Sequence, residues 1–364
     1  MKKLRRRVEL FNGICIGLDL HKRFIQMSVL DGAGDEVAAD RFASDRDVLL
    51  KQLDRFVSGG EPVRVVIEAS GCFVWVYDLL VERLGRESVQ VAAPSRVKVI
   101  AEAGEKTDAS DAWWLAYLAR EGRLPEAFVA EGELRELRIA SRELRSVTDE
   151  RSDLMRRLKS HLAQLGLGFS ASWWASVAGR AKIETLVAEV ASAHGERGRA
   201  VSRLWSRIKS LNDEVAYWRD RVKALGDRFE QVEALQAELP GMGPQLAAVV
   251  WSELGDPSRY HRAKAYSKAT GLTPGYRESG GRRTGQSITR MGSAHVRWAL
   301  TRAVLACLRC QRGPGVAVKR WVQKQSRRKP KKAAMVAAAR KLAEGVWRLF
   351  KLGEAFDLRR AFPA

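Results

Sequence analysis

The sequence predicts a multidomain protein in which a mixed α/β domain precedes two regions that are mainly helical. Three observations support this fold class. Short β-branched runs alternate with helical patterns up to about residue 121, an apolar coiled-coil repeat dominates residues 131–235, and the chain beyond Leu239 is again mostly helical in pattern. We therefore expect an α/β domain, a helical coiled-coil region and a helical C-terminal domain, which span 1–128, 129–236 and 237–364.

The first domain is predicted to begin as a meander of three antiparallel strands. The runs ICIGLDL and FIQMSVL are apolar, and the turn DGAGD separates the second run from EVAADRFA. Ser44 or Asp45 is a suitable N-cap for the helix that follows. The predicted strands span 14–20, 24–30, 36–43, 63–69 and 89–94, and the predicted helices span 45–57, 74–84 and 108–120. The resulting order is βββαβαβα, which is typical of a mixed α/β domain.

The middle region has the repeat of a coiled-coil seam. Apolar residues recur at alternating steps of four and three at Leu204, Ile208, Leu211, Val215, Trp218, Val222, Leu225, Phe229 and Val232. An earlier, less regular arm over 134–165 is separated from this seam by Gly166–Gly168 and Trp173–Trp174. We expect a long helical hairpin that pairs with another subunit to give a dimer or tetramer. The alternative is that the hairpin packs only on itself.

The positive charge of the chain is concentrated near its C-terminal end. The net charge is +21, and residues 262–351 contain 23 Lys or Arg but only two acids, Glu278 and Glu344. The rest of the chain is balanced, with 41 basic and 41 acidic residues. A segment of one sign indicates a polyanionic partner, and nucleic acid fits best. A membrane surface is the weaker alternative, because no basic amphipathic helix with an aromatic face is evident.

The sequence contains no membrane span, and its cysteines predict no disulfide framework. No run of about 18 apolar residues occurs, and no signal-peptide core follows the basic N-terminus, so we expect a cytoplasmic protein that acts at the nucleoid. Cys15 and Cys72 lie in apolar contexts that favour the core. Cys307 and Cys310 form a CxxC without a second pair, and we interpret them as neighbours on one helix face.

Four acidic residues form a candidate metal site. Asp19 ends the first predicted strand, Glu68 ends the fourth, and Asp108 and Asp111 lie one turn apart on a predicted helix. An acid at the end of an apolar strand is costly unless it is solvated, paired or bound to a cation. Oxygen ligands suit Mg²⁺, with Mn²⁺ as an alternative, and paired ions can promote phosphoryl displacement. Each acid alone has a structural explanation, but together they have the layout of an RNase H-like domain.

Three C-terminal stretches suggest contact with phosphates. The turn at the start of LPGMGPQLAAVVWSEL resembles the phosphate-holding turn of helix-hairpin-helix modules, although any tight helix start has this pattern. The stretch TPGYRESGGRRTG sets Ser279 before two glycines, where a loop serine is the simplest interpretation. The stretch VKRWVQKQSRRKPKK contains eight bases and Trp321, and we expect a phosphate-contacting arm whose tryptophan stacks on a base. Its alternative is a solvated tail.

These motifs together resemble one family of bacterial DEDD transposases, the insertion-sequence one-ten family, also called bridge RNA-guided recombinases. The segments GLDLHK, VVIEASG and KTDASDA resemble the RuvC-like N-terminal domain of that family. The segments LPGMGPQLAAVVWSELGD and YSKATGLTPGYRESGGRRTGQSITRMGSAHVRWAL resemble its second conserved domain. The resemblance thus covers both ends of the chain, with a coiled coil between them.

The resemblance implies roles for individual residues. The four acids correspond to the metal ligands of the family, and Ser279 corresponds to its serine nucleophile. The chain has Glu278 where the family often has a second serine, so a carboxylate adjoins the nucleophile. His21 receives no role beyond the surface or a strand edge. The expected nucleic-acid contacts, from the resemblance and the basic composition together, are Lys22, Arg277, Gly280, Gly281, Arg282, Arg283, Arg290, Lys319, Arg320, Arg327, Arg328, Lys329, Lys331 and Lys332.

The function that the resemblance implies is excision and insertion of the protein's own mobile element. A structured RNA encoded by the element would pair with donor and target DNA, and the metal site would meet Ser279 within the assembly, from the same or another subunit. A metal-dependent nuclease of the junction-resolving kind and a site-specific DNA invertase of the same family are alternatives. A non-enzymatic nucleic-acid scaffold is a third, which the complete set of four acids argues against.

Overall fold

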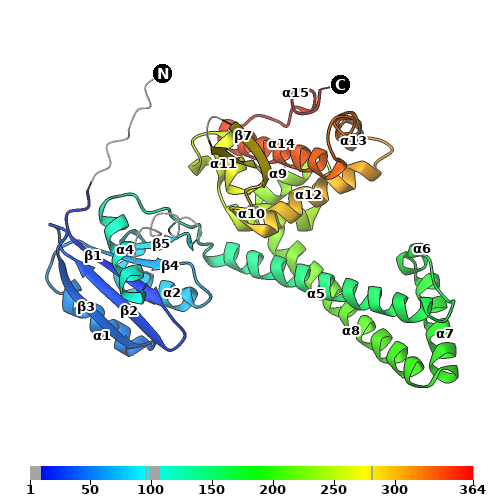
Figure 1. Ribbon diagram of the computed structural model, residues 1–364, viewed down its shortest axis with the longest axis horizontal. Helices are drawn as coiled ribbons and strands as arrows, with labels where there is room; N and C mark the ends of the chain where they lie inside the picture. Colours follow the sequence, from blue (N-terminus) through cyan, green and yellow to red (C-terminus); the bar gives the residue numbers. More distant parts are fainter. Residues whose placement is uncertain (1–9, 95–96, 98–106, 280–281, 364) are drawn as a thin grey trace. The chain divides into compact units, whose positions relative to one another are not determined.

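The structure is a computed structural model that describes residues 10–94, 97, 107–279 and 282–363 (Figure 1). The chain divides into two compact units, Met1–Val129 and Ala130–Ala364. The first unit is mixed α/β, and the second is mostly helical. No helix in the described ranges has the length and apolar character that a membrane crossing requires.

A five-stranded sheet in the order β3-β2-β1-β4-β5 forms the centre of the first unit. The first three strands are antiparallel neighbours, whereas β4 runs parallel to β1, and β5 runs parallel to β4. The strands are β1 (Ile14–Leu20), β2 (Phe24–Leu30), β3 (Glu36–Ala43), β4 (Val63–Glu68) and β5 (Val89–Ala92). Every predicted strand is present, and only the last two end earlier than predicted, by one and two residues.

Helices cover both faces of this sheet. Helices α1 (Arg46–Val57) and α2 (Phe73–Leu84) bury apolar side chains against residues of one face, such as Ile16 and Leu18. Helix α4 (Asp108–Arg120) packs on the opposite face, against β1, β2 and β4. It approaches β1 closely, because a Cβ atom on Gly17 would lie 2.0 Å from the Ala112 carbonyl oxygen. The glycine in GLDLHK therefore permits the close packing of α4 on the strand that ends near Asp19.

The second unit begins with a helical hairpin. Helices α5 (Gly132–Ala163) and α8 (Gly195–Gly226) form its arms, and α6 (Ala171–Ala175) and α7 (Val177–Ala193) lie between them in the chain. The predicted break after residue 165 is confirmed. Residues of the predicted seam on α8 are buried inside this chain, where Ile208 packs with Leu158, and Val215 belongs to the same core as Leu144. The seam does not continue as one helix, because α8 ends at Gly226 and α9 (Glu230–Glu238) follows a turn.

The rest of the second unit is a cluster of helices with one β-hairpin. Its core combines alanine-rich α14 (Lys331–Leu352), α12 (Ala294–Arg309) and α10 (Pro244–Leu254). The strands β6 (Pro274–Ser279) and β7 (Arg282–Ile288) pair antiparallel in a region that the sequence analysis did not assign to strands. The remaining helical elements are η2 (Pro257–Arg259), α11 (Ala263–Ala269), α13 (Gly315–Gln325) and α15 (Leu358–Ala361).

The cysteines agree only in part with the predictions made from their sequence contexts. All four are free; Cys15 and Cys307 are buried, and Cys72 and Cys310 are partly buried. Burial raises the pKa of the Cys15 thiol to about 11, so this thiol is protonated at neutral pH. Cys310 does not share the helix face of Cys307 within one helix, because it is the residue that ends α12.

Candidate active site

Two of the four acids lie at the same edge of the sheet. The register of β1 and β4 pairs Gly17 with Val66, so two residues further along the parallel strands Asp19 aligns with Glu68. Side chains alternate between faces along a strand, and Val66 packs with residues of α4. Asp19 and Glu68 therefore both start on the sheet face that α4 covers, at the carboxyl ends of neighbouring strands.

The other two acids lie in the first turn of α4. Thr107 caps this helix by accepting a hydrogen bond from the Ser110 amide, and the Ser110 hydroxyl accepts one from the Thr107 amide. Asp108 follows the cap directly, and Asp111 lies three residues later in the same turn. Carboxylates in the first turn of a helix are stabilised by the helix dipole, so the local sequence suits both the helix start and the presence of two acids.

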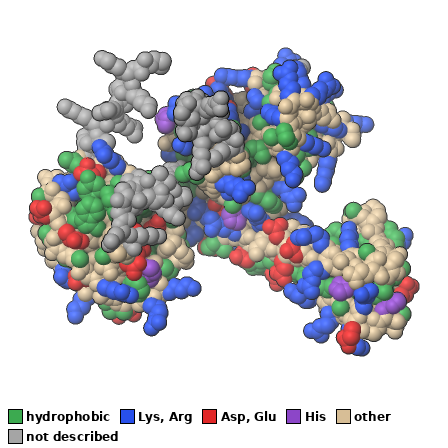
Figure 2. All heavy atoms as spheres, in the orientation of Figure 1, with side chains coloured by type: hydrophobic (Ala, Val, Ile, Leu, Met, Phe, Trp, Pro, Cys, Tyr) green, Lys and Arg blue, Asp and Glu red, His purple; other side chains and the backbone are tan. Residues whose placement is uncertain are grey.

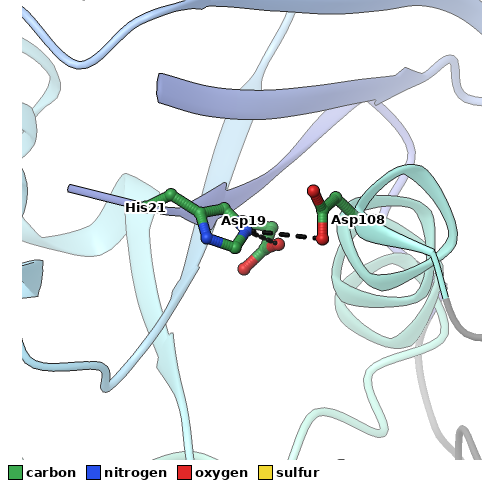
Figure 3. Close-up of side chains that lie close together, drawn as sticks. All are labelled: Asp19, His21 and Asp108. Atoms are coloured by element: carbon green, nitrogen blue, oxygen red, sulfur yellow. Dashed lines mark hydrogen bonds and ion pairs between the residues drawn. The ribbon is translucent and has the colours of Figure 1, made fainter. Parts of the chain in front are cut away.

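The structure brings Asp19, His21 and Asp108 together (Figure 3). The His21 Nε2 atom lies 2.9 Å from Asp19 Oδ2 and 3.5 Å from Asp108 Oδ1. One ligand atom from each residue lies within 4.8 Å of the others. The Asp19 side chain is 15% exposed and that of Asp108 is 46% exposed, so the group opens to solvent on the side of α4. Asp111, one turn after Asp108 on α4, also acts on the charge of Asp19. We call the three acids Asp19, Asp108 and Asp111 the carboxylate cluster.

The electrostatics of Asp19 favour a bound cation. Burial raises the pKa of the Asp19 carboxyl, His21 lowers it, and the negative charges of Asp111 and Asp108 raise it further, so that the net shift is upward. The ionised form of Asp19 is thus destabilised in the absence of positive charge. A divalent cation next to the carboxylates would remove this cost.

The donor set fits a hard divalent ion. Magnesium has near-octahedral coordination with bonds of about 2.0–2.1 Å, so two opposite ligand atoms lie about 4.2 Å apart. One ligand atom from each of the three side chains lies within 4.8 Å of the others, which is close to this spacing. Asp19 and Asp108 could be oxygen ligands, Asp111 and Glu68 are acids near the same edge, and His21 contacts the Asp19 carboxylate.

The second candidate group is on the β-hairpin of the second unit. Ser279 is the last residue of β6 and pairs in register with Arg282, the first residue of β7. The same register sets Glu278 opposite Arg283 and Arg277 opposite Thr284. Gly280 and Gly281 lie outside the described residues. The predicted nucleophile is thus at the far end of a two-stranded ribbon.

The base of this hairpin is held by Arg297 of α12. Its Nη1 atom donates to the carbonyl oxygens of Gly292 at 2.7 Å and of Arg290 at 3.1 Å, with a longer contact of 3.4 Å to that of Thr270. The two segments that lead to and from the hairpin cross closely here. A Cβ atom on Gly292, whose φ is +146°, would lie 1.9 Å from the Ala269 carbonyl oxygen. Arg297 therefore donates to three backbone carbonyls at a point where the chain passes too close to Ala269 for any residue but glycine at position 292.

The predicted basic contacts fall on several elements. Lys22 is exposed in the turn after β1, and Arg290 follows β7 with a left-handed φ of 55°. Lys319 and Arg320 lie on α13, where the Lys319 ammonium donates to the Cys310 carbonyl oxygen at 3.2 Å. Arg327, Arg328 and Lys329 lie between α13 and α14, and Lys331 and Lys332 begin α14. Figure 2 shows Lys and Arg side chains gathered over these C-terminal helices.

One expectation for this basic stretch, the stacking of Trp321, is wrong. Helices α13 and α14 form most of the stretch, and its contact with phosphates stays a prediction. Trp321 is only 8% exposed, and its ring packs edge-on against Phe362 with 5.6 Å between the ring centroids. The expected stacking of this ring on a nucleic-acid base is therefore corrected, because the ring belongs to the core.

Sequence reasoning missed three features of these sites. The sequence predicts the surface or a strand edge for His21, although it lies two residues after Asp19 and the alternation of β1 sets both on one side. The hairpin was missed as well, although two glycines between the polar runs GYRES and RRTGQ are a recognised hairpin signal. Arg297 had no sequence signal, because only the fold brings its guanidinium to three distant carbonyls.

The class of the protein follows from comparison with known families. The family model for DEDD transposases of the IS110 type, described as "Transposase", matches residues 16–166, and the model described as "Transposase IS116/IS110/IS902 family" matches residues 233–317. The first match includes the carboxylate cluster, and the second includes the β6–β7 hairpin. These matches define the class as transposases. Within this class, the chain belongs to the IS110 family.

Individual relatives agree with this assignment. The transposase for insertion sequence element IS1111A of Coxiella burnetii is 25% identical over 158 residues, which are 43% of each protein. Two putative transposases of Sinorhizobium fredii match over nearly the whole chain. The protein y4pF/y4sB is 24% identical over 94% of this chain and 85% of its own length, and y4rJ is 26% identical over 96% and 95%. The chain thus spans less than half of the first relative and most of the other two.

Proposed function

We propose that the protein is a DNA recombinase that excises its own insertion sequence and inserts it at a target. The observation that best supports this is the carboxylate cluster, in which Asp19 and Asp108 approach within ligand distance in a chain of the IS110 family. The chain also has a serine at the end of a hairpin in a strongly basic region. Metal-supported chemistry on a phosphodiester uses both features.

The first unit would be an RNase H-like domain of the RuvC type. Three antiparallel strands followed by two parallel ones, in the order β3-β2-β1-β4-β5, support this interpretation. The acids at the ends of β1 and β4 and at the start of α4 support it further. We also propose that the second unit has two functional parts, a helical region up to residue 236 and a C-terminal transposase domain from residue 237.

Ser279 would be the nucleophile of strand exchange. Its hydroxyl oxygen would bond to the phosphorus of a DNA phosphodiester, one P–O ester bond would break, and the departing strand would take a proton in exchange for the one the serine loses. The resulting phosphoserine ester retains the bond energy for rejoining. Arg277, Arg282 and Arg283 lie on the same two strands and would balance the charge of the phosphate oxygens.

The carboxylate cluster would hold Mg²⁺ or Mn²⁺ through Asp19 and Asp108, with Glu68 and Asp111 as the further acids. When bound, such an ion supplies stabilisation of negative charge on phosphoryl and leaving oxygens. His21 would orient the Asp19 carboxylate through the hydrogen bond between its Nε2 atom and Oδ2. The structure of the cluster thus supports a hydrolytic or strand-transfer role near DNA phosphates.

A guide RNA and a second subunit complete the proposal. The excess of basic residues over 262–351 supports contact with RNA as well as DNA, because both are polyanions. Because the seam of α8 is used inside the chain, pairing of subunits would use other side chains of the hairpin. Ile139 on α5 and Tyr217 on α8 are examples of exposed apolar side chains that could serve, with 46% and 57% exposure.

Trapping of a covalent intermediate tests the proposal. The protein is incubated with Mg²⁺, the DNA that flanks its gene and the transcript of the adjacent noncoding region, and DNA linked to protein is sought on a denaturing gel. We expect an adduct that is absent in Ser279→Ala and reduced in Asp19→Ala. Inversion products instead of excision products would identify a DNA invertase of the same family.

A metal-dependent nuclease is the second candidate. Asp19, His21 and Asp108 approach one another within the first unit alone, so hydrolysis would not require Ser279. In this case the same gel shows free DNA ends without an adduct, and Ser279→Ala cleaves as well as the wild type. That outcome would rule out the serine mechanism and leave the serine as a turn residue.

A further inference from the structure

The surface beside the base of the β6–β7 hairpin contains a pocket of about 570 Å³. Its lining comes from the start of β6, from the residues after β7, from α11 and from α14. Four of the lining residues are basic, Arg262, Lys264, Lys268 and Arg340, and one is acidic, Glu344. We call this the hairpin-base pocket. None of its residues belongs to the nucleic-acid contacts expected from the sequence.

The charges of the hairpin-base pocket are largely uncompensated. Arg340 pairs with Glu344 at 3.3 Å, one turn further along α14. Arg262, Lys264 and Lys268 are exposed and have no ion pair with a described residue. Three unpaired cations around a concave site raise the local concentration of anions. The pocket is therefore suited to a ligand with several negative charges.

Two hydroxyl groups of the pocket wall support the same ligand. Ser267 is fully buried and Thr289 is partly buried, and neither Oγ has a hydrogen-bond partner among the described residues. A buried hydroxyl without a partner is destabilising. Phosphate oxygens accept hydrogen bonds from hydroxyl groups as well as from ammonium and guanidinium groups. A phosphate in the pocket would therefore satisfy both the charges and the hydroxyls.

We propose that the hairpin-base pocket binds backbone phosphates of the DNA strand that Ser279 attacks. This inference rests on the proposed function and extends it to a second site of DNA binding. Pro274 lines the pocket and begins the strand that ends at Ser279, five residues later. At about 3.3 Å per residue the serine lies about 17 Å from the pocket, a distance that a few consecutive phosphates of one DNA strand can span. The pocket would hold the strand and so fix which phosphate reaches the hairpin end.

The test uses full-length protein with Ser279→Ala as the background, so that binding is measured without strand cleavage. In this background, Lys264→Gln with Lys268→Gln is compared with a control, Arg203→Gln with Arg221→Gln. The control removes the same charge from exposed positions of α8. The affinity for a labelled duplex of the element end is measured by fluorescence anisotropy over a series of KCl concentrations. The pocket pair should lower the salt slope by about 0.9 for each phosphate that the pocket no longer neutralises, whereas the control keeps the slope.

A positional measurement locates the bound phosphate. Single phosphates of the duplex are replaced by neutral methylphosphonates, one position at a time. The unmodified pocket should lose affinity when one phosphate a few positions from the attacked one is neutralised, and the pocket pair should be insensitive at that position. Ser267→Ala should weaken binding about fivefold without changing the salt slope, because it removes a hydrogen bond and no charge.

Three results would overturn the inference. The first is an unchanged salt slope in the pocket pair, and the second is an equal reduction of the slope in the control. The third is a weakening of binding seen only with the structured RNA as probe, which would assign the pocket to RNA. Failure of the serine mechanism is distinguishable, because the adduct would then be missing in protein with native Ser279 while the pocket variants still bound DNA more weakly.

Discussion

The carboxylate cluster and the β6–β7 hairpin hold their proposed reactive groups by different means. Asp19 extends from a central strand of a five-stranded sheet, and Asp108 begins a helix packed against that strand. Ser279 ends a two-stranded ribbon whose base is joined to α12 by Arg297. The core of the first unit thus positions the acids directly, whereas the serine depends on a few contacts at a distance from it. Perturbations of the two regions should therefore differ in kind.

The largest effect is expected for Asp19→Asn. Loss of this ligand should remove several kcal/mol of transition-state stabilisation, which lowers the rate of adduct formation about a thousandfold. It should also abolish the thermal stabilisation by Mg²⁺, which for a wild-type site is about 2.7 kcal/mol at a hundred times the dissociation constant. Differential scanning fluorimetry with and without Mg²⁺ measures the second effect independently of activity.

Without a bound ion, Asp19→Asn should not lower the thermal stability of the protein. Because burial and the neighbouring acids raise the pKa of Asp19, its charge destabilises the folded state at neutral pH, and Asp19→Asn should melt no lower than the wild type. Asp35→Asn, which neutralises an exposed acid of the same unit, serves as the control and should keep its response to Mg²⁺. A normal Mg²⁺ response in Asp19→Asn would refute the proposed ion site.

Arg297→Met should weaken the reaction by loosening the hairpin. The substitution leaves the carbonyls of Gly292 and Arg290 without the guanidinium, and a displacement of about 1 Å at a reacting group can cost about a hundredfold in rate. Affinity for DNA should stay near the wild-type value. Hydrogen exchange should accelerate at the Thr289 and Arg290 amides, which bond to Thr273 and Gly271.

A control substitution on α12 separates the positioning role of Arg297 from the effect of its charge. Arg302 is exposed on α12 and lies near the Trp298 ring, with no contact to the hairpin base among those described. Arg302→Met removes the same charge and should leave both the rate and the exchange of the two amides unchanged. Equal effects of the two substitutions would mean that Arg297 acts through charge alone and does not position the hairpin.

Glu253 tests how firmly the hairpin helices join the C-terminal helices within the second unit. Its buried carboxylate accepts hydrogen bonds from Arg142 of α5, at 2.7 and 3.1 Å, and from the Ser293 hydroxyl that caps α12. Glu253→Gln should lower the free energy of unfolding by about 2 kcal/mol, because charged hydrogen bonds are removed and a guanidinium is left with a weaker partner. Chemical denaturation at neutral pH measures this change.

The pH dependence of stability tests the same interaction between Glu253 and Arg142. Burial alone would raise the pKa of Glu253, but the hydrogen bond and charge of Arg142, with Arg138 and His295, outweigh it and lower the pKa. The contribution to stability is therefore present above the ordinary carboxyl pKa and is lost as the pH falls through the lowered value. Glu253→Gln should lack this acid-side decrease in stability. The exposed pair of Glu133 with Arg228 provides the control, since Glu133→Gln should cost about 0.5 kcal/mol or less.

The two regions also differ in how far the sequence predicts them. The five strands and the positions of the four acids follow from β-branched runs and from acids at strand and helix ends, which are local signals. The sequence repeat of α8 predicted an apolar seam. It did not show what covers this seam, because the covering residues belong to α5, far away in the chain. Arg297, the crossing at Gly292 and the hairpin-base pocket depend on contacts between distant segments, and no local pattern encodes them.

Substitution of His21 should give the smallest effect, because this residue only supports a ligand of the carboxylate cluster. Its ring stacks on Phe24, with 4.4 Å between centroids, so packing fixes the imidazole that contacts Asp19. Groups that orient a metal ligand typically contribute a factor of ten to a hundred in affinity. His21→Gln should therefore shift the Mg²⁺ midpoint of thermal stabilisation about tenfold upward without abolishing it, whereas the neighbouring Arg23→Gln should not shift it. A loss as complete as that of Asp19→Asn would make His21 a direct ligand, and no shift would limit its role to packing on Phe24.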